Sequence, residues 1–375
     1  MPRYAAMLAD GMKQRNHEVA IWQPAPFFYK INIIYSLKKW LGYIDQYIVF
    51  PMQAKKRMKN LSADTIFVFT DHALGPWVPL AKDRPHIIHC HDFLAQRSAL
   101  GEFKENHVGV TGRIYQSLIR KGYQKGKNFI SVSAKTKEDL HRFVKHTPSI
   151  SEIVYNGLNQ QFEDSDVECA KKTFGKKTGI DLSRGYLLHV GGNQWYKNRI
   201  GVIDIYNAFR KQSDIQIPLL LIGASPSDEL KKSQEQSSFK DQIHFLVNID
   251  DKFLKLAYRG ASVFLFPSLA EGFGWPIAEA MASGCPVITT NEKPMTEVAG
   301  SAAFFIPRKP ANKELAEEWA TDAAKLVKKV LQLTAQERQQ VICKALGNIE
   351  RFSADDALDR IENIYKRVYL STTQQ

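Results

Sequence analysis

The sequence lacks the long apolar stretches that a membrane-spanning segment needs. No apolar run in its 375 residues approaches the ~20 residues that cross a bilayer, and no signal-peptide pattern opens it. With 44% apolar and 24% charged residues, the composition excludes wholesale disorder. The length exceeds one ordinary core and fits two domains. We therefore predict a folded cytoplasmic protein, either free or peripheral on the inner face of the membrane.

Cysteine is scarce, and what there is forms no motif. The four cysteines are scattered without C-x-x-C spacing: Cys90, Cys169, Cys285 and Cys343. This pattern disfavours disulfides and a zinc site, and it favours buried free thiols.

Signatures of nucleic-acid binding are also missing. The sequence has no zinc-finger spacing, no RNP-like aromatic strand and no single helix that gathers the basic residues. A net charge of +12 and a pI near 9.3 nevertheless favour an anionic partner, which could be nucleic acid, acidic lipid or a phosphorylated substrate. The missing signatures disfavour the first of these, so we expect no nucleic-acid partner.

Short apolar runs alternate with helical patterns along the whole chain. A helix over residues 2–13 precedes a short strand at 18–22, and buried strands are expected at 64–71 and 85–92. The alternation restarts after a polar, lysine-rich stretch near 157–184. We predict an α/β fold of two Rossmann-like, doubly wound domains that face each other across a cleft, where ligands bind. The domains are 1–165 and 166–350, with a C-terminal helix at 351–375 that packs back on the first.

The stretch FPSLAEGFGWPIAEA sets two glutamates, Glu271 and Glu279, on either side of a glycine-rich turn. Pro276 suits a first helical turn, which places Glu279 about one turn into the helix. Because Gly272 and Gly274 lack side chains, the free N–H groups of the helix start can approach an anion such as a diphosphate. The two carboxylates could then accept hydrogen bonds from sugar hydroxyls. Two solvated glutamates around an ordinary strand–helix turn are the alternative.

A second motif, LLHVGGNQWYKNR, ends a strand in Gly191 and Gly192. A loop begins at Asn193, and Lys197 and Arg199 lie close to the next helix start. Glycines let a phosphate approach the backbone, and the cations can neutralise it. Solvated basic residues near a helix start are the alternative.

Together these motifs resemble the family 4 retaining glycosyltransferases of GT-B fold. The resemblance is strongest over residues 186–307, from HVGG…YKN through the E-x7-E pattern to MTEVAGSAAFFI, and it extends more loosely to SVSAKTKEDL and VYNGLN in the first half. It implies two Rossmann-like domains, of which the second binds a nucleotide-sugar donor.

The resemblance implies a role for each matching residue. Glu271 would hold hydroxyls of the transferred sugar, and Phe273 and Gly274 would line the sugar and phosphates with their backbone. Glu279 would bind the nucleotide ribose, and Lys197 would stabilise the diphosphate as it leaves.

His91, in HCHD, resembles a first-domain histidine that faces the donor sugar, although a structural histidine at a strand end is nearly as good an interpretation. The sequence departs from the family in two ways. Gly192 stands where the family usually has an arginine, and Arg199 is the candidate replacement. The family's opening strand and glycine-rich loop are also missing ahead of residues 2–13. Either the chain has been started too late, or this protein works without that loop.

The reaction implied is transfer of a sugar, with retention, from a nucleotide-diphosphate sugar to a hydroxyl acceptor, in cell-surface polysaccharide or glycolipid synthesis. No Asp-x-Asp motif lies in the donor region, so we expect no metal and no cofactor beyond the substrate. The alternatives are a non-catalytic nucleotide-sugar-binding subunit and a nucleotide-sugar epimerase of the same fold.

Residues 26–59 mix aromatic and aliphatic side chains with seven basic residues against one acidic residue, Asp45. The basic residues are Lys30, Lys38, Lys39, Lys55, Lys56, Arg57 and Lys59. This mixture suits a surface resting on anionic lipid, and it would fit a lipid-linked acceptor. The alternative is a domain helix whose apolar side is core.

Overall fold

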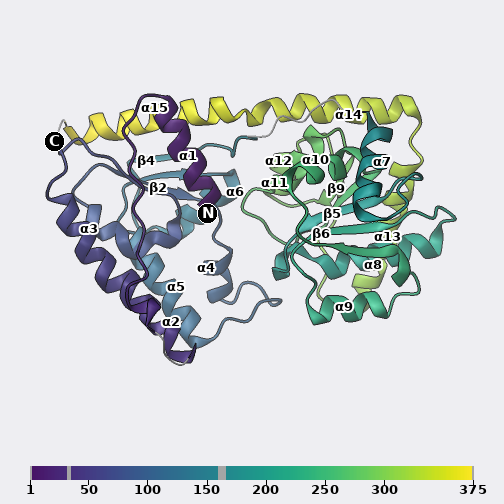
Figure 1. The fold of residues 1–375 in the computed structure, drawn as a ribbon, viewed down its shortest axis with the longest axis horizontal. Coiled ribbons are helices and arrows are strands. Elements are labelled where there is room, and N and C mark those ends of the chain that lie inside the picture. The colour runs from purple at the N-terminus through teal and green to yellow at the C-terminus, as the bar shows by residue number, and fades with distance from the viewer. Residues whose placement is uncertain (1, 32–34, 159–165, 374–375) are drawn as a thin grey trace. The chain divides into compact units, whose positions relative to one another are not determined.

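The computed structural model describes residues 2–31, 35–158 and 166–373. The chain divides into two compact units: unit 1 comprises Met1–Gly157 with Ala354–Gln375, and unit 2 comprises Leu158–Ser353. Each unit is a parallel sheet with helices packed on it (Figure 1). The chain leaves unit 1 after Gly157 and returns to it at Ala354, close to the changes expected after residues 165 and 350.

Unit 1 contains a four-stranded parallel sheet in the order β1-β2-β3-β4. Its strands are β1 (Phe67–Phe69), β2 (His86–Cys90), β3 (Asn128–Ser131) and β4 (Ile150–Ile153). Its helical elements are α1 (Pro2–Gln14), η1 (Phe28–Lys30), α2 (Tyr35–Ile44), η2 (Asp45–Val49), α3 (Phe50–Met58), η3 (His72–Ala81), α4 (Leu94–Ala99), α5 (Val110–Tyr123), α6 (Ala134–Phe143) and α15 (Ala354–Thr373).

The two central strands, β2 and β3, are buried on both faces, which explains why consecutive residues such as Ile87 and Ile88 are both apolar rather than alternating with polar ones. Ile88 packs in a core cluster with residues of η3 and α5. Its neighbour Ile87 points to the other face and packs in a cluster with residues of α1 and α15. The C-terminal helix α15 contributes Ile361, Tyr365 and Val368, whose spacing places them on one helical face. The last helix of the chain is therefore part of the core of unit 1.

Unit 2 contains a six-stranded parallel sheet in the order β10-β9-β8-β5-β6-β7. Its strands are β5 (Leu187–Gly191), β6 (Leu219–Gly223), β7 (Ile243–Leu246), β8 (Val263–Phe266), β9 (Val287–Thr290) and β10 (Phe304–Ile306). Its helical elements are α7 (Val167–Thr178), η4 (Trp195–Lys197), α8 (Arg199–Gln212), α9 (Asp228–Glu235), η5 (Lys240–Gln242), α10 (Asp251–Gly260), α11 (Trp275–Ala282), α12 (Met295–Ala299), α13 (Lys313–Leu331), α14 (Ala335–Ile349) and η6 (Glu350–Phe352).

The strand order of unit 2 reverses between β5 and β8. From β5 the chain builds β6 and β7 outward on one side, and then crosses back to add β8, β9 and β10 on the other. In doubly wound sheets, ligands bind at the carboxyl ends of the strands at such a switch point. The ends of β5 and β8 are therefore where the site is expected.

Two expectations from the sequence are wrong. No strand forms at residues 18–22, because this segment follows α1 without pairing to any described strand. The four cysteines are free, but only Cys90 and Cys285 are buried, whereas Cys169 and Cys343 are exposed.

Across the described ranges, no helix is both long and apolar enough to cross a bilayer.

Candidate functional site

The loops that follow β5 and β8 are bonded to each other at the switch point. Asn198 adopts a left-handed conformation with φ of 51° and caps α8 by accepting a hydrogen bond from the N–H of Gly201. Its side-chain amide also donates to the carbonyl oxygen of Pro267, at 2.9 Å. The N–H of Leu269 donates to the carbonyl oxygen of Tyr196, at 2.7 Å. These bonds hold Lys197, which lies between Tyr196 and Asn198, against the end of β8.

Lys197 and Glu271 form an ion pair at the junction of these loops. The Lys197 Nζ lies 2.8 Å from Glu271 Oε1, and the two side chains are only 15% and 7% exposed. The ammonium also lies 5.1 Å from the centroid of the Phe266 ring. Because water screens such a pair poorly, removal of either charge would leave the other in an unfavourable environment. The structure thus brings together the two residues that the sequence assigns to the diphosphate and the sugar.

Glycine at 274 allows the turn from Glu271 into α11. Gly274 has φ of 105°, a conformation that residues with side chains rarely adopt. It precedes Trp275, and Pro276 occupies the first turn of α11. No side chain caps this helix start, where Pro276 carries no N–H and the N–H of Ile277 donates to the carbonyl oxygen of Gly274 at 3.0 Å. Phe273 lies behind the turn, buried, with its ring 5.5 Å from the ring of Phe352.

Glu279 is held in place by a tyrosine. Its Oε2 accepts a hydrogen bond from the hydroxyl of Tyr258 at 3.0 Å. Burial raises the pKa of Tyr258, and the neighbouring Glu279 carboxylate adds to this effect. Tyr258 therefore stays protonated and fixes the orientation of the Glu279 carboxylate.

Arg199 is buried rather than solvated. Its Nη1 donates to the Asn193 side chain at 2.5 Å and to the carbonyl oxygen of Ala224 at 3.0 Å. Burial lowers the pKa of Arg199 to about 10, so the group is still charged at neutral pH. Its Nε and Nη2 are buried with no hydrogen-bond partner among the described residues. The structure thus links Arg199 to Asn193 and leaves part of its donor capacity unused.

His189 is a member of this site that the sequence interpretation missed. It is fully buried on β5, and its Nδ1–H donates to the carbonyl oxygen of Leu265 at 2.9 Å. Its Nε2 has no partner in the described part of the chain. A Cβ at Gly191 would lie 3.0 Å from this nitrogen and 3.5 Å from Lys197 Cδ, so the glycine leaves room for both side chains. The HVGG motif offers only a weak signal for it, because His86 and His89 are buried on β2 in the same way.

Acid should destabilise unit 2 through His189. Burial, with the nearby cations Arg199 and Lys197, lowers the pKa of His189 to about 3, whereas a histidine in an unfolded chain titrates near ~6.5. The unfolded state therefore binds the proton first as pH falls. Above pH ~6.5 the full contribution of His189 to the free energy of unfolding is present. Below it, this contribution is lost at ~1.4 kcal/mol per pH unit. Urea unfolding of the wild type and His189→Gln at several acidic pH values tests this, and equal pH slopes would contradict it.

His91 belongs to unit 1, whereas the other candidate residues belong to unit 2. The ring is 8% exposed, and its Nε2–H donates to the carbonyl oxygen of Thr70 at 2.9 Å. The edge of Tyr4 packs on it at 4.5 Å between ring centroids. Burial lowers the pKa of His91, and Asp71 only partly opposes this effect. His91 is therefore neutral at physiological pH, with one ring nitrogen engaged by the protein itself.

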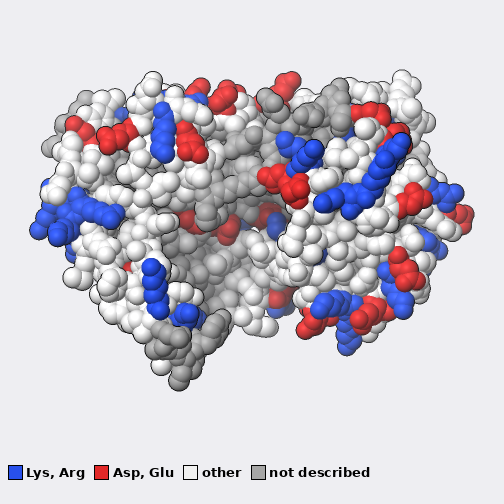
Figure 2. All heavy atoms as spheres, in the orientation of Figure 1, with Lys and Arg blue, Asp and Glu red and all other residues white. Residues whose placement is uncertain are grey.

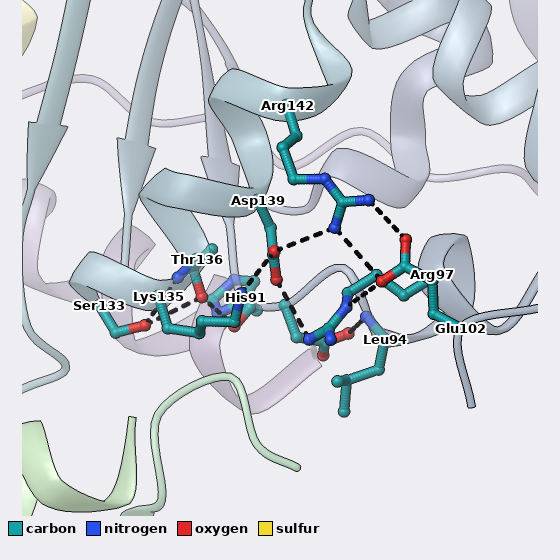
Figure 3. A network of polar contacts seen from close by, with 10 residues as sticks. His91, Leu94, Arg97, Glu102, Ser133, Lys135, Thr136, Asp139 and Arg142 are labelled. Carbon is teal, nitrogen blue, oxygen red and sulfur yellow. Dashed lines mark hydrogen bonds and ion pairs between the residues drawn. The ribbon is translucent and has the colours of Figure 1, made fainter. Parts of the chain in front are cut away.

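A polar network anchors the loop that carries His91 (Figure 3). The Thr136 hydroxyl donates to the backbone oxygen of His91 at 3.3 Å. Further along α6, buried Asp139 pairs with Lys135 at 2.7 Å and with Arg97 of α4 at 3.6 Å. Arg97 in turn pairs with Glu102 at 2.9 Å. The loop after β2 is thus fastened to the start of α6.

In the ranges that the structure describes, no group of three or more His, Cys, Asp or Glu side chains could hold a metal ion.

Two protein-family models match the two halves of the chain. Residues 1–162 match the model described as Glycosyltransferase Family 4, and residues 170–346 match the one described as Glycosyl transferases group 1. One similar protein is the O-antigen chain mannosyltransferase B of Escherichia coli, which is 33% identical over 123 residues. That match covers 32% of this chain and 32% of the relative.

Solved structures with the same fold cover nearly the whole chain. Sucrose-phosphate synthase from Thermosynechococcus elongatus aligns with a TM-score of 0.74 at 14% identity, covering 98% of this chain and 93% of that one. HepE from Anabaena, in complex with UDP and glucose, aligns with a TM-score of 0.67 at 15% identity, covering 86% and 82%. The family and fold expected from the sequence are confirmed. The chain belongs to the family 4 type of glycosyltransferases, transferase enzymes of GT-B fold.

Proposed function

We propose that this chain transfers a sugar from a nucleotide-diphosphate donor to a hydroxyl group of an acceptor, with retention of configuration at the anomeric carbon. The observation that carries the proposal is the pair of Lys197 and Glu271, 2.8 Å apart, at the ends of β5 and β8. An ammonium suits a diphosphate, and a carboxylate suits sugar hydroxyls. The two stand together where ligands of doubly wound sheets bind.

The parts of the donor are assigned to separate elements of unit 2. Glu271 accepts hydrogen bonds from hydroxyls of the transferred sugar. The diphosphate lies at the start of α11, against the backbone of Gly272, Phe273 and Gly274, with Lys197 beside it. Glu279, oriented by Tyr258, binds the ribose hydroxyls.

The remaining assignments concern the supporting residues. Gly191 and Gly192 let the phosphates approach the end of β5. Arg199, held by Asn193, supplies the second positive charge that the arginine missing at position 192 would otherwise give. His91, which belongs to unit 1, is assigned to the donor sugar on the family resemblance alone.

In the transfer step, the bond between the anomeric carbon and the diphosphate oxygen breaks while the acceptor oxygen bonds to the same face of that carbon. The acceptor proton passes to the departing phosphate oxygen. Negative charge grows on the leaving diphosphate, so Lys197 stabilises the transition state more than the ground state. Donor binding also separates Lys197 from Glu271, and each then pairs with the substrate. We expect no metal in this step, because Lys197, Arg199 and the start of α11 supply the positive charge.

The finer proposal concerns the sugar and the biological setting. We propose a hexose, with mannose as the first candidate, in the synthesis of a cell-surface polysaccharide or glycolipid. The Escherichia coli relative, named as an O-antigen chain mannosyltransferase, supports mannose. The Anabaena structure, which holds UDP and glucose, supports a nucleotide-diphosphate donor.

The acceptor side of the proposal rests on the surface of unit 1. The first part of the chain exposes large apolar side chains: Phe27, Tyr29, Ile31, Leu37, Trp40, Ile48 and Met52. Lys55, Lys56 and Arg57 lie in the last turn of α3. Figure 2 shows a group of basic side chains at the left edge of unit 1, the side on which Figure 1 labels α3. Apolar and basic side chains together suit the surface of an anionic membrane. We propose peripheral contact with the inner face of the membrane and a lipid-linked acceptor, and failure to bind anionic vesicles at low salt would contradict this.

The transfer reaction is tested by release of the nucleotide. The protein is incubated with GDP-mannose, UDP-glucose and UDP-N-acetylglucosamine, each with and without EDTA, and free nucleoside diphosphate is measured. We expect release from at least one donor at a rate that EDTA leaves unchanged. A rate abolished by EDTA and restored by a divalent cation would contradict the metal-free step. Binding without release would indicate a non-catalytic subunit, and a new nucleotide sugar without release would indicate an epimerase.

A further inference from the structure

Unit 1 contains a pocket that the donor site does not use. It lies between η1, α2 and the start of η2, with a volume of about 560 Å³. Lys38, Lys39 and Tyr43 of α2 line it, together with Tyr29 of η1 and Asp45 of η2. This volume is within the range of small-molecule sites, ~300–1,000 Å³.

The local structure builds this pocket in a defined shape. The Asp45 side chain is buried, and its two carboxylate oxygens accept the N–H groups of Phe28 and Tyr29, each at 2.9 Å. This fixes η1 against the end of α2. A Cβ at Gly42 would lie 3.3 Å from the Tyr29 ring, so glycine allows that ring to approach α2 closely.

The two lysines give the pocket its charge. Lys38 Nζ lies 5.2 Å from the centroid of the Tyr29 ring, and Lys39 Nζ lies 5.8 Å from that of Tyr43. Among the ion pairs of the described ranges, none involves either lysine. The Asp45 carboxylate also lines the pocket and keeps its negative charge, but it is bonded to backbone N–H groups and forms no ion pair with either lysine, so the pocket retains a net positive charge. Two ammonium groups over aromatic rings in one pocket suit a phosphate group.

The surface beside the pocket is apolar. On α2, Leu37 is 51% exposed and Trp40 is 61% exposed. The neighbouring α5 exposes Val110, Ile114 and Leu118, whose spacing of four residues places them on one face. Tyr115 of α5 joins the two helices, stacking on Tyr43 at 6.0 Å between centroids. Figure 1 shows α2 and α5 next to each other in unit 1.

We propose that the pocket binds the phosphate group of a phosphorylated lipid, whose hydrocarbon chain lies on the apolar surface of α2 and α5. Two other ligands fit these features less well. A free anion would use the lysines but not the exposed apolar residues, and a protein partner would require neither the pocket nor the unpaired lysines inside it. The assignment of this lipid as the sugar acceptor rests on the proposed function. The binding itself does not.

The test is calorimetric titration of the full chain, and it needs no turnover. The probes are inorganic phosphate, dodecyl phosphate below its micelle concentration, and vesicles of phosphatidylcholine with or without phosphatidylglycerol. The variant is K38Q/K39Q. The matched control is K55Q/K56Q, which removes the same charge from exposed positions on α3.

We expect dodecyl phosphate to bind at least ~10-fold more tightly than inorganic phosphate, and K38Q/K39Q to weaken it by ~10-fold or more while K55Q/K56Q stays within ~2-fold. Equal affinity for the two soluble probes would overturn the lipid part of the proposal. Unchanged binding of dodecyl phosphate by K38Q/K39Q would overturn the pocket. A third outcome would also overturn the pocket: dodecyl phosphate does not bind, and K38Q/K39Q and K55Q/K56Q weaken vesicle binding equally. The lysines would then contribute only to general contact with the membrane. Absence of donor turnover would count against the proposed function and leave these results standing.

Discussion

Replacing Lys197 by methionine is expected to lower kcat by ~10²–10³-fold, the cost of removing one group that stabilises developing charge. The reason is its position: Lys197 follows β5 and pairs with Glu271 in the loop that leads into α11, where we place the leaving diphosphate. Methionine keeps the apolar stem and its packing near the Phe266 ring. Measurement of nucleoside diphosphate release at saturating donor gives the effect on kcat.

The same substitution should destabilise the protein, because it leaves the Glu271 carboxylate buried without its partner. Breaking a buried pair costs on the order of 3 kcal/mol. The matched control is Lys197→Met combined with Glu271→Gln, which removes both charges. This double variant should recover most of the lost stability in thermal unfolding and none of the activity. If the double variant recovered both stability and activity, Lys197 would contribute to the stability of the fold and not to catalysis.

Glu271→Gln alone is expected to lower kcat by ~10²-fold or more, because the amide replaces a charged acceptor for the sugar hydroxyls at the reacting end of the donor. Glu279→Gln should act differently. Its carboxylate is assigned to the ribose, away from the reacting carbon, so the variant should mainly raise the KM for the donor. Steady-state kinetics with a varied donor separate the two effects.

The control for both glutamates is Glu235→Gln, an exposed position at the end of α9. It should leave kcat and KM unchanged. If Glu271→Gln and Glu279→Gln instead change the same constant by the same factor, the separate roles given to the two carboxylates are wrong.

Much of the site could be predicted from the sequence because it depends on local patterns. The strand before Glu271, the glycine turn and the proline at the start of α11 are each encoded within a few residues. The pairing of Lys197 with Glu271 follows from sheet order, since β5 and β8 are neighbours although they are far apart in the chain.

What the sequence did not predict depends on packing between distant segments. The burial of Arg199 results from contacts with Asn193 and with Ala224 beyond β6, which no local spacing encodes. The orientation of the His189 ring is likewise fixed by a distant residue, because its Nδ1–H donates to the carbonyl oxygen of Leu265, and this leaves Nε2 unpaired among the described residues. The strand expected at residues 18–22 failed because an apolar pattern forms a strand only where a neighbouring strand can pair with it.

The central claim is that the diphosphate of the donor binds at Lys197 and the start of α11. It is tested most directly by calorimetric titration of GDP and UDP into the wild type and into the charge-free pair Lys197→Met/Glu271→Gln. We expect at least one of the two nucleotides to bind the wild type, and the double variant to bind it at least ~10-fold more weakly. Equal affinity in the two proteins would contradict the placement of the donor.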